Sequence, residues 1–255
     1  MSSENFATMT SEELLAQKLK RFENLNHYRR DNELHWLGRA KVSEEIGEYA
    51  EAVKYCSRGI TRAPSNGLLY VERGRLSMLQ GEYSEAAADL ARSIDLYNGE
   101  WSAWYHYGII QYILRDYANA EEAFADALDA AATPGAEAMS AYWMWITLQK
   151  LGDKKAAAEL VAEWENDTDS LEEETAKSCA AVLALAKGQG EAAEVLGGVV
   201  DNGEASMTRL YGVYIAYRYG EKNAAKAAEI LERMLAANAD SSLYTLAFRA
   251  ALGEK

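Results

Sequence analysis

The sequence predicts an all-α fold built from repeated antiparallel helix pairs. Residues 67–100 and 101–134 align with each other over 34 positions. The two segments share small, aromatic and aliphatic residues at matching places: Gly74 with Gly108, Tyr83 with Tyr117, Ala86 with Ala120, and Ile94 with Leu128. A period of this length accommodates two helices and a turn. The composition agrees, because helix-favouring residues are abundant and the two prolines, Pro64 and Pro134, both fall where a repeat ends.

An earlier copy of the repeat begins at Glu33. Its residues at the corresponding places are Trp36, Ala40, Gly47, Tyr49, Ala52, Ile60 and Pro64. Together these positions resemble the tetratricopeptide repeat family, most closely over residues 33–134 and more loosely up to 165 and beyond. The resemblance implies a right-handed superhelical solenoid of antiparallel helix pairs with terminal capping helices. It also implies a protein that binds other chains.

The N-terminal residues are expected to end the solenoid. Residues 1–9 are predicted to be disordered. Thr10 and Glu13 then form the pattern of a capping box, which opens a helix. We therefore expect a capping helix within residues 10–32, because a terminal repeat has an outer face without a neighbour.

Four helix pairs are predicted over residues 33–165. The expected helices are 32–46 and 51–62, 67–80 and 83–97, 101–114 and 117–131, and 134–150 and 153–165. Gly74 and Gly108 should lie on inner faces, where a small residue lets two helices approach closely. Thr133 and Pro134 are typical of an N-cap followed by proline in the first helical position.

The repeat pattern degenerates after an acidic segment at 166–174. Over residues 166–241 we expect two further pairs, with helices at 171–187 and 190–198 and at 205–219 and 222–237. Residues 242–255 are predicted to contain a C-terminal capping helix. This arrangement closes the predicted solenoid at its second end.

The charge of the chain favours a protein partner. The formal net charge is −14 and the pI is about 4.8, so a nucleic acid is not expected to bind. Acidity that serves solubility alone is the alternative. The N-terminal sequence has no secretory pattern and no apolar run of 18 residues occurs, which predicts a cytoplasmic protein without a membrane partner. A homo-oligomer remains open.

No catalytic, cofactor or metal site is predicted. His27, His35 and His106 lack the spacing of metal ligands. Residues 188–193, GQGEAA, match a dinucleotide-binding pattern, but an Ala/Leu-rich helical stretch precedes them where that motif needs a strand. We interpret these glycines as a helix–helix turn. Cys56 and Cys179 are expected to be free, buried residues.

The aromatic content points to a binding groove. The chain has 16 Tyr and six Trp against four Phe, and Tyr and Trp are favoured interface anchors. In tetratricopeptide arrays the first helix of each pair lines the concave surface. Carried over by repeat register, together with neighbouring His106, this predicts a peptide-binding groove formed by Leu37, Lys41, Val71, Arg75, Met78, Tyr105, His106, Ile109, Tyr112, Tyr142 and Ile146. The alternative is that the N-terminal helix or the last helices of the chain fill this groove.

The predicted function is a non-catalytic interaction module or scaffold that binds a peptide or protein segment in an aromatic concave groove. A cytoplasmic chaperone for a specific client is one alternative, and an enzyme with a site on a repeat scaffold is another. The subtype that clamps a C-terminal carboxylate is disfavoured, because the fifth places of the first helices are Leu37, Val71 and Tyr105.

Overall fold

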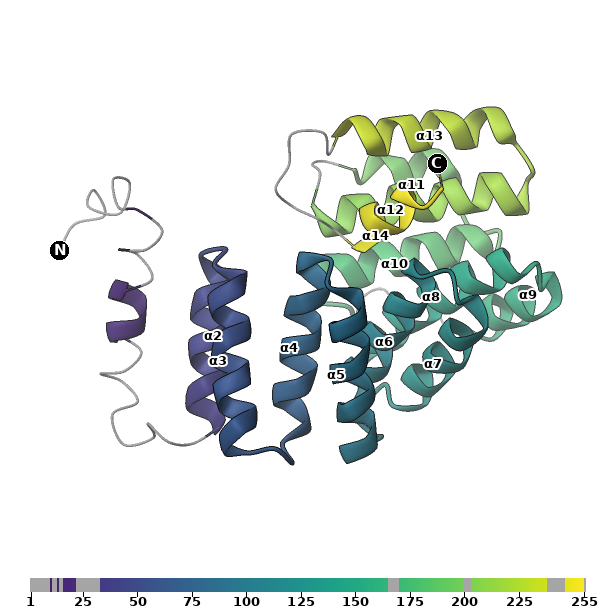
Figure 1. The fold of residues 1–255 in the computed structure, drawn as a ribbon. Coiled ribbons are helices and arrows are strands. Elements are labelled where there is room, and N and C mark those ends of the chain that lie inside the picture. The colour runs from purple at the N-terminus through teal and green to yellow at the C-terminus, as the bar shows by residue number, and fades with distance from the viewer. Residues whose placement is uncertain are drawn as a thin grey trace. The chain divides into compact units, whose positions relative to one another are not determined.

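A computed structural model describes Thr10, Glu13 and residues 16–21, 33–164, 170–199, 203–237 and 246–254. Helices and the turns between them account for all of the secondary structure in these residues (Figure 1). The predicted all-α class is therefore confirmed. The chain divides into two compact units, Met1–Ala103 and Trp104–Lys255, and the boundary falls inside helix α6 (Trp101–Ile113).

The first unit is built from two antiparallel helix pairs. Helix α2 (Glu33–Glu45) packs against α3 (Tyr49–Arg62), and α4 (Gly67–Gln80) packs against α5 (Tyr83–Leu96). Helix α3 also contacts α4, so the pairs stack (Figure 1). Their inner faces meet in a cluster of buried residues: Ala40, Ala52, Tyr55, Cys56 and Leu76.

The predicted close approach at Gly74 is confirmed. A Cβ atom at this position would lie 2.9 Å from Leu90 Cγ and 3.1 Å from the Ala86 carbonyl oxygen. Real Cβ atoms do not tolerate the shorter distance, so glycine is what lets α4 and α5 pack together. The absence of a side chain at Gly74 thus determines how closely α4 and α5 approach each other.

The second unit contains the rest of α6 and the helices that follow it. Helices α7 (Tyr117–Asp129), α8 (Pro134–Leu151), α9 (Lys154–Glu163), α10 (Glu174–Ala186) and α11 (Ala192–Gly197) come first. Helix α12 (Glu204–Ile215) continues into a π-helical turn, η4 (Ala216–Gly220), and is followed by α13 (Ala224–Ala237) and α14 (Leu246–Leu252). The first helices of successive pairs, α8, α10 and α12, pack against one another. Their facing side chains form the core, in which Phe124, Tyr142 and Tyr211 are fully buried.

Several predicted helix ends are confirmed by their caps. Thr133 Oγ1 accepts a hydrogen bond from the Ala136 amide at 3.2 Å, with Pro134 in the first turn of α8. The Thr10 and Glu13 capping box is present, with Glu13 N donating to Thr10 Oγ1 at 3.2 Å and Thr10 N donating to Glu13 Oε2 at 2.9 Å. These bonds satisfy amides that a helix start leaves without a backbone partner.

Two turns depart from the glycine rule. Gly81 and Gly152 have positive φ at the ends of α4 and α8, a conformation that glycine adopts readily. After α6, however, Arg115 takes this conformation with φ 65°, and in the turn between η4 and α13 the positive φ falls on Lys222. A left-handed conformation costs a side-chain residue about 1–2 kcal/mol, so at both places the surrounding packing outweighs the local preference.

Some expected segments lie outside the described residues. These are residues 1–9, most of the predicted capping helix at 10–32, and positions 166–169 of the acidic segment. Residues 16–21 of that capping helix are helical. In the predicted C-terminal capping helix, the described part is α14, which is seven residues long.

Candidate binding site

The predicted groove residues of the first unit differ in their exposure. Lys41 is exposed, Leu37 and Arg75 are half-buried, and Val71 and Met78 are buried. The structure brings Lys41 and Arg75 together around a depression of about 620 Å³. It is lined by Lys41, Glu44, Glu45, Tyr49, Glu72 and Arg75. We call these six residues the charged depression.

Arg75 organises the charged depression. Its Nη1 and Nη2 atoms donate to the two carboxylate oxygens of Glu44 at 2.7 and 2.6 Å, and Nη2 also donates to Glu72 at 2.9 Å. Burial lowers the pKa of Arg75, but the hydrogen bonds to these carboxylates outweigh burial and raise it. The guanidinium is thus committed to its neighbours. With three carboxylates against two cations, the lining carries a formal charge of −1.

Most of the predicted groove residues in the second unit are buried. Tyr105 and Tyr112 are only 6% and 2% exposed, and Tyr142, Ile109 and Ile146 are fully buried. His106 is half-buried. This corrects the prediction of an open groove for the five buried positions, and later residues of the chain contact two of them, Tyr112 and Tyr142.

Helix α12 provides that cover. The hydroxyl groups of Tyr112 and Tyr211 lie 2.6 Å apart in a hydrogen bond, and the Tyr142 hydroxyl donates to the Thr208 carbonyl at 2.8 Å. Burial raises the pKa of both Tyr112 and Tyr142, so these phenols stay protonated and can donate. The predicted alternative, in which the last helices fill the groove, therefore describes this part of the molecule.

The carboxylate of Glu254 lies against α8 and α12. Lys150 Nζ forms an ion pair with Glu254, and both side chains are 8% exposed. The Tyr211 and Tyr214 hydroxyls donate to the Glu254 carboxylate at 2.9 and 3.1 Å. Lys150 also donates to the Tyr219 hydroxyl at 2.9 Å.

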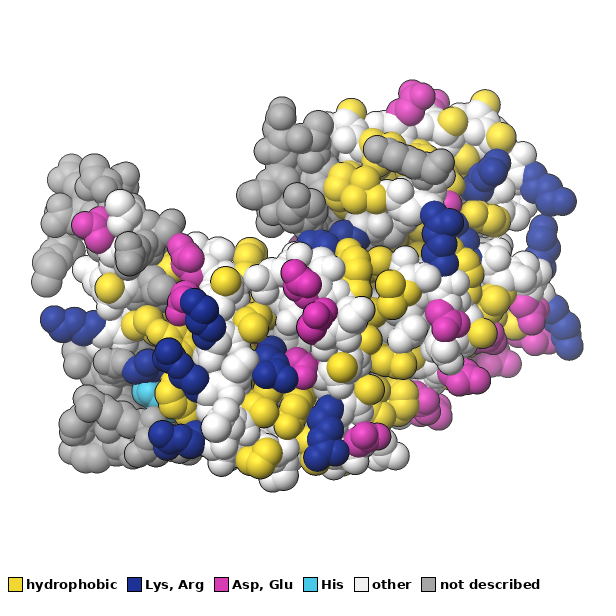
Figure 2. Space-filling model, in the orientation of Figure 1, with side chains coloured by type: hydrophobic (Ala, Val, Ile, Leu, Met, Phe, Trp, Pro, Cys, Tyr) yellow, Lys and Arg dark blue, Asp and Glu magenta, His cyan; other side chains and the backbone are white. Residues whose placement is uncertain are grey.

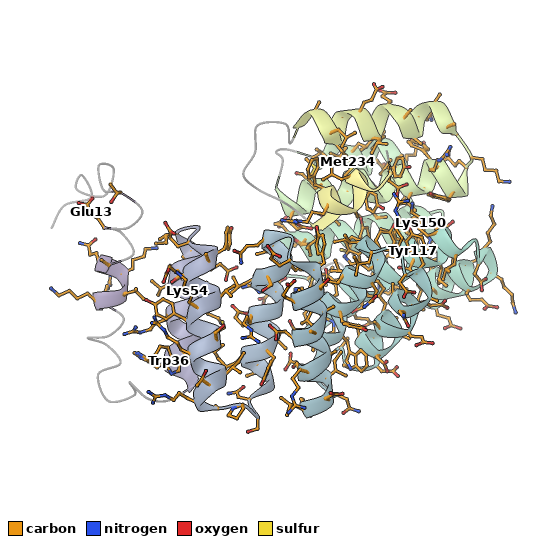
Figure 3. The ribbon with its side chains drawn as sticks, in the orientation of Figure 1. Glu13, Trp36, Lys54, Tyr117, Lys150 and Met234 are labelled. Atoms are coloured by element: carbon orange, nitrogen blue, oxygen red, sulfur yellow. The ribbon has the colours of Figure 1, made fainter. Side chains whose placement is uncertain are left out.

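Two further groups hold the same segment. Arg115 Nη2 donates to the Gly253 carbonyl at 2.5 Å. At the other end of α14, Glu204 accepts the amide of Leu246 at 2.9 Å. Burial raises the pKa of Glu204 to about 7 despite the backbone hydrogen bonds that lower it. Figure 3 labels Lys150 beside Tyr117, whose ring centroid lies 5.9 Å from Lys150 Nζ. We call the five residues Arg115, Lys150, Tyr211, Tyr214 and Tyr219 the tail pocket.

The sequence prediction missed the tail pocket. Tyr211 and Tyr214 are three residues apart, so their shared helix face could have been found from spacing. Lys150 stands in the last turn of a predicted helix, which is an ordinary place for a basic residue. Glu254 carries no local signal, because its partners come from segments far away in the sequence.

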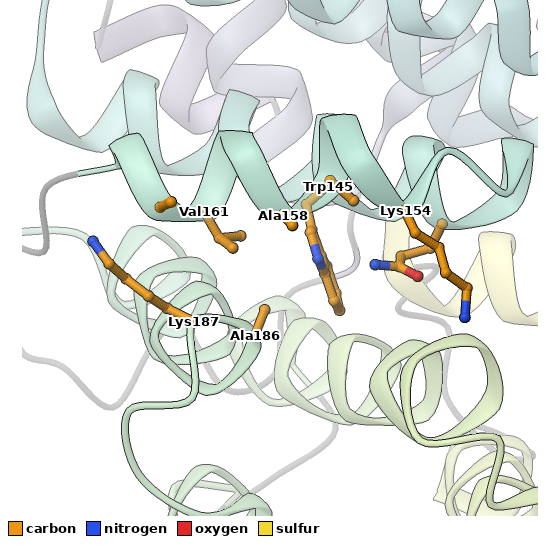
Figure 4. A pocket seen from close by; sticks show the side chains of 9 residues that line it. Trp145, Lys154, Ala158, Val161, Ala186 and Lys187 are labelled. Atoms are coloured by element: carbon orange, nitrogen blue, oxygen red, sulfur yellow. The ribbon is translucent and has the colours of Figure 1, made fainter.

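A third hollow lies between α8, α9 and the end of α10 (Figure 4). It has a volume of about 360 Å³ and an alanine-rich lining, with Trp145 on one side and Lys154 and Lys187 towards its ends. The Lys187 ammonium donates to the Trp164 carbonyl at 2.9 Å. This cation is therefore already engaged within the unit.

The glycine motif and the two cysteines have the local structure that the sequence predicts. Gly188 and Gly190 both have positive φ in the turn between α10 and α11, which confirms that the GQGEAA segment joins two helices. Cys56 and Cys179 are buried free thiols, as predicted. Within the described ranges, no cluster of three or more His, Cys, Asp or Glu side chains could hold a metal ion. No helix among these residues has the length and apolar character to cross a membrane.

The fold and the motifs together define a protein of stacked helix pairs, and comparison with known proteins finds the same repeat and the same fold elsewhere. The tetratricopeptide repeat family matches residues 102–134. A tetratricopeptide repeat protein of known structure from Parabacteroides merdae is 13% identical, with a TM-score of 0.53 over 92% of this chain and 90% of that chain. The crystal structure of MamA matches with a TM-score of 0.50 at 16% identity, over 57% of this chain and 84% of that chain. A search of characterised sequences found no match. The family match therefore covers the third repeat that the 34-residue period predicted, and the likeness to the solved structures shows the same fold.

Proposed function

We propose that the protein is a non-catalytic interaction scaffold that binds a segment of another protein at the charged depression of the first unit. Support comes from the repeat fold, which presents first helices as binding surfaces, and from the position of the depression on two of them, α2 and α4. The observation that carries the proposal is that Lys41 and Arg75, two of the predicted groove residues, line this depression together.

The chemistry of the depression favours a basic partner segment. Arg75 is neutralised by two carboxylates, so it has little capacity to attract an anion. Glu45, by contrast, has a side chain that is 63% exposed, even though it pairs with Lys18 at 3.1 Å. An exposed ion pair of this kind contributes little stability and exchanges readily. The carboxylate of Glu45 is therefore available to a Lys or Arg of a partner.

The surface around the depression is mixed in charge. On the face drawn in Figure 2, acidic and basic side chains lie next to one another over α2 to α5. The formal net charge of −14 adds a long-range attraction for a basic segment. Leu37 is half-buried and lies about one helical turn before Lys41 on α2, so the proposed partner combines basic and apolar side chains.

Peptide titration tests the proposal. The probes are two synthetic peptides, one alternating Leu with Lys and the other alternating Leu with Glu, titrated at about 0.1 M salt so that screening stays moderate. We expect saturable binding of the Leu/Lys peptide and much weaker binding of the Leu/Glu peptide. The Glu45→Lys variant should weaken binding of the Leu/Lys peptide by about fivefold or more, which corresponds to about 1 kcal/mol.

The matched control is Glu85→Lys, which makes the same charge change at an exposed position on α5, outside the depression. This variant should keep most of the affinity. If both variants weaken binding equally, the effect comes from net charge alone and the depression is not the site. Absence of saturable binding to either peptide would also count against the proposal.

A further inference from the structure

Glu254 is bound within the second unit in the manner of a ligand. Its carboxylate oxygen Oε1 receives Lys150 and the Tyr211 hydroxyl, and Oε2 receives the Tyr214 hydroxyl. The donors come from α8 and α12, which lie far from residue 254 in the sequence. A buried carboxylate is stable only when its charge is paired and its oxygens accept hydrogen bonds, and both conditions are met here.

The tail pocket is held in place by bonds that do not involve Glu254. Lys150 keeps its hydrogen bond to Tyr219, and its ammonium lies 4.9 Å from the Tyr219 ring centroid. The Tyr211 hydroxyl is in turn bonded to Tyr112, whose ring is fully packed. The pocket is thus preorganised, and removal of Glu254 would leave a buried cation that requires another anion.

The tail pocket also forms a hydrogen bond with the peptide backbone. Arg115 donates to the carbonyl of Gly253, the residue before the bound glutamate. Recognition of a carboxylate together with the preceding carbonyl favours a peptide over a free inorganic anion. The ligand class is therefore a peptide with an acidic residue.

The residues that occupy the pocket can leave without unfolding α14. Ala247, Phe248 and Ala251 bury the inner face of that helix, whereas Leu252, its last residue, is 41% exposed. Gly253 and Glu254 continue only as a turn, through amides that donate to Ala250 and Ala251. Release of these two residues costs their own polar contacts and leaves the apolar contacts of α14 in place.

We propose that the tail pocket is a recognition site for the acidic residue of a peptide from another protein, with Gly253–Glu254 as its resident internal ligand. A partner gains access by displacing this segment. The inference is independent of the charged depression in the first unit, which favours partners of the opposite charge. Failure of one proposal therefore leaves the other unaffected.

A competition experiment on the full chain tests the inference. The probe is a labelled synthetic peptide with the sequence of residues 246–255, and the control peptide has Gln in place of the glutamate. The Glu254→Gln variant, which keeps the shape of the side chain and removes its charge, should bind the probe at least about tenfold more tightly than the wild-type chain. The Gln peptide should bind that variant at least about tenfold more weakly than the probe does.

Two matched variants separate this effect from a general one. Glu229→Gln removes a charge at an exposed position on α13 and should behave as the wild-type chain. Adding Lys150→Met to Glu254→Gln should abolish probe binding. Equal binding of both peptides, or no binding to a folded Glu254→Gln variant, would overturn the inference.

A second measurement applies if Glu254→Gln fails to fold. A fluorophore on Lys255→Cys, selective because Cys56 and Cys179 are buried, reports release of the tail from an otherwise wild-type chain. The acidic probe should lower the fluorescence anisotropy and the Gln peptide should not. Unchanged anisotropy at saturating probe concentration would overturn the inference. Dimerisation of the wild-type chain that Glu254→Gln abolishes would also overturn it, because the partner would then be a second copy of this chain.

Discussion

Replacing Gly108 by alanine should destabilise the second unit through one added methyl group. A Cβ atom at this position would lie 2.7, 2.8 and 2.9 Å from three atoms of the Phe124 ring. The ring is fully buried and stacks on Trp143 at 6.3 Å between centroids, so it has little room to move away. Overpacking of this kind costs about 1–3 kcal/mol. Alanine also favours a helix by about 1 kcal/mol over glycine, which leaves a net loss of about 0–2 kcal/mol. Because three ring atoms lie within 3.0 Å of the added Cβ, we expect the upper half of this range.

Thermal unfolding followed by circular dichroism measures this loss. For a chain of this size, 1 kcal/mol shifts the melting temperature by about 2–4 °C, so Gly108→Ala should melt about 2–8 °C lower than the wild-type chain. The control is Gly197→Ala, at the end of α11, where an added Cβ would meet no atom within 4 Å. If Gly108→Ala melts at or above the wild-type temperature, α6 and α7 are not packed as described.

Three further predictions concern ionisable groups. Burial raises the pKa of Glu204 to about 7 from an ordinary 4.5, so the folded chain retains a proton that the unfolded chain releases. The contribution of this proton to the free energy of unfolding is fully present below about pH 4.5. It falls by about 3 kcal/mol as the pH rises from there through 7. Urea unfolding at about pH 5 and pH 8 should show this loss, and Glu204→Gln should flatten it; an equal slope in both proteins would contradict the assignment. Arg75→Ala leaves two half-buried carboxylates without their cation and should cost about 1–3 kcal/mol in urea unfolding, whereas an unchanged midpoint would show that solvent already screens them. Burial raises the pKa of the Cys56 thiol to about 12 and that of Cys179 well above its usual range, so iodoacetamide should label neither in the folded chain; labelling as fast as in urea would refute this.

The sequence was sufficient to predict the helices and their closest contacts. The 34-residue period aligns Gly74 with Gly108, and both prove to be places where a Cβ would collide with the second helix of the pair. Caps at Thr10 and Thr133 were also predictable, because their signals lie within three residues of each other. Local patterns therefore determine local structure and the packing within a pair.

The accessible surface was not predictable in the same way. Helical spacing correctly places Tyr112 and Tyr142 on the inner faces of their helices, but it cannot tell which later element covers that face. The covering residues, Tyr211 and Thr208, follow 99 and 66 positions later in the chain. Glu254 was missed for the same reason. Contacts at long sequence separation depend on how the degenerate repeats fold back, and no short motif encodes that.

Hydrogen–deuterium exchange with the Leu/Lys peptide tests the central claim most directly, because it shows where a partner binds without prior choice of a variant. Our account predicts that the peptide slows exchange in segments that contain Lys41–Tyr49 and Glu72–Arg75, the parts of α2, α3 and α4 around the charged depression. Segments with Tyr105–Tyr112 and Tyr142–Ile146 should be unchanged, because α12 already covers them. Protection confined to these latter segments would contradict the account, since the partner would then enter the face that we describe as closed.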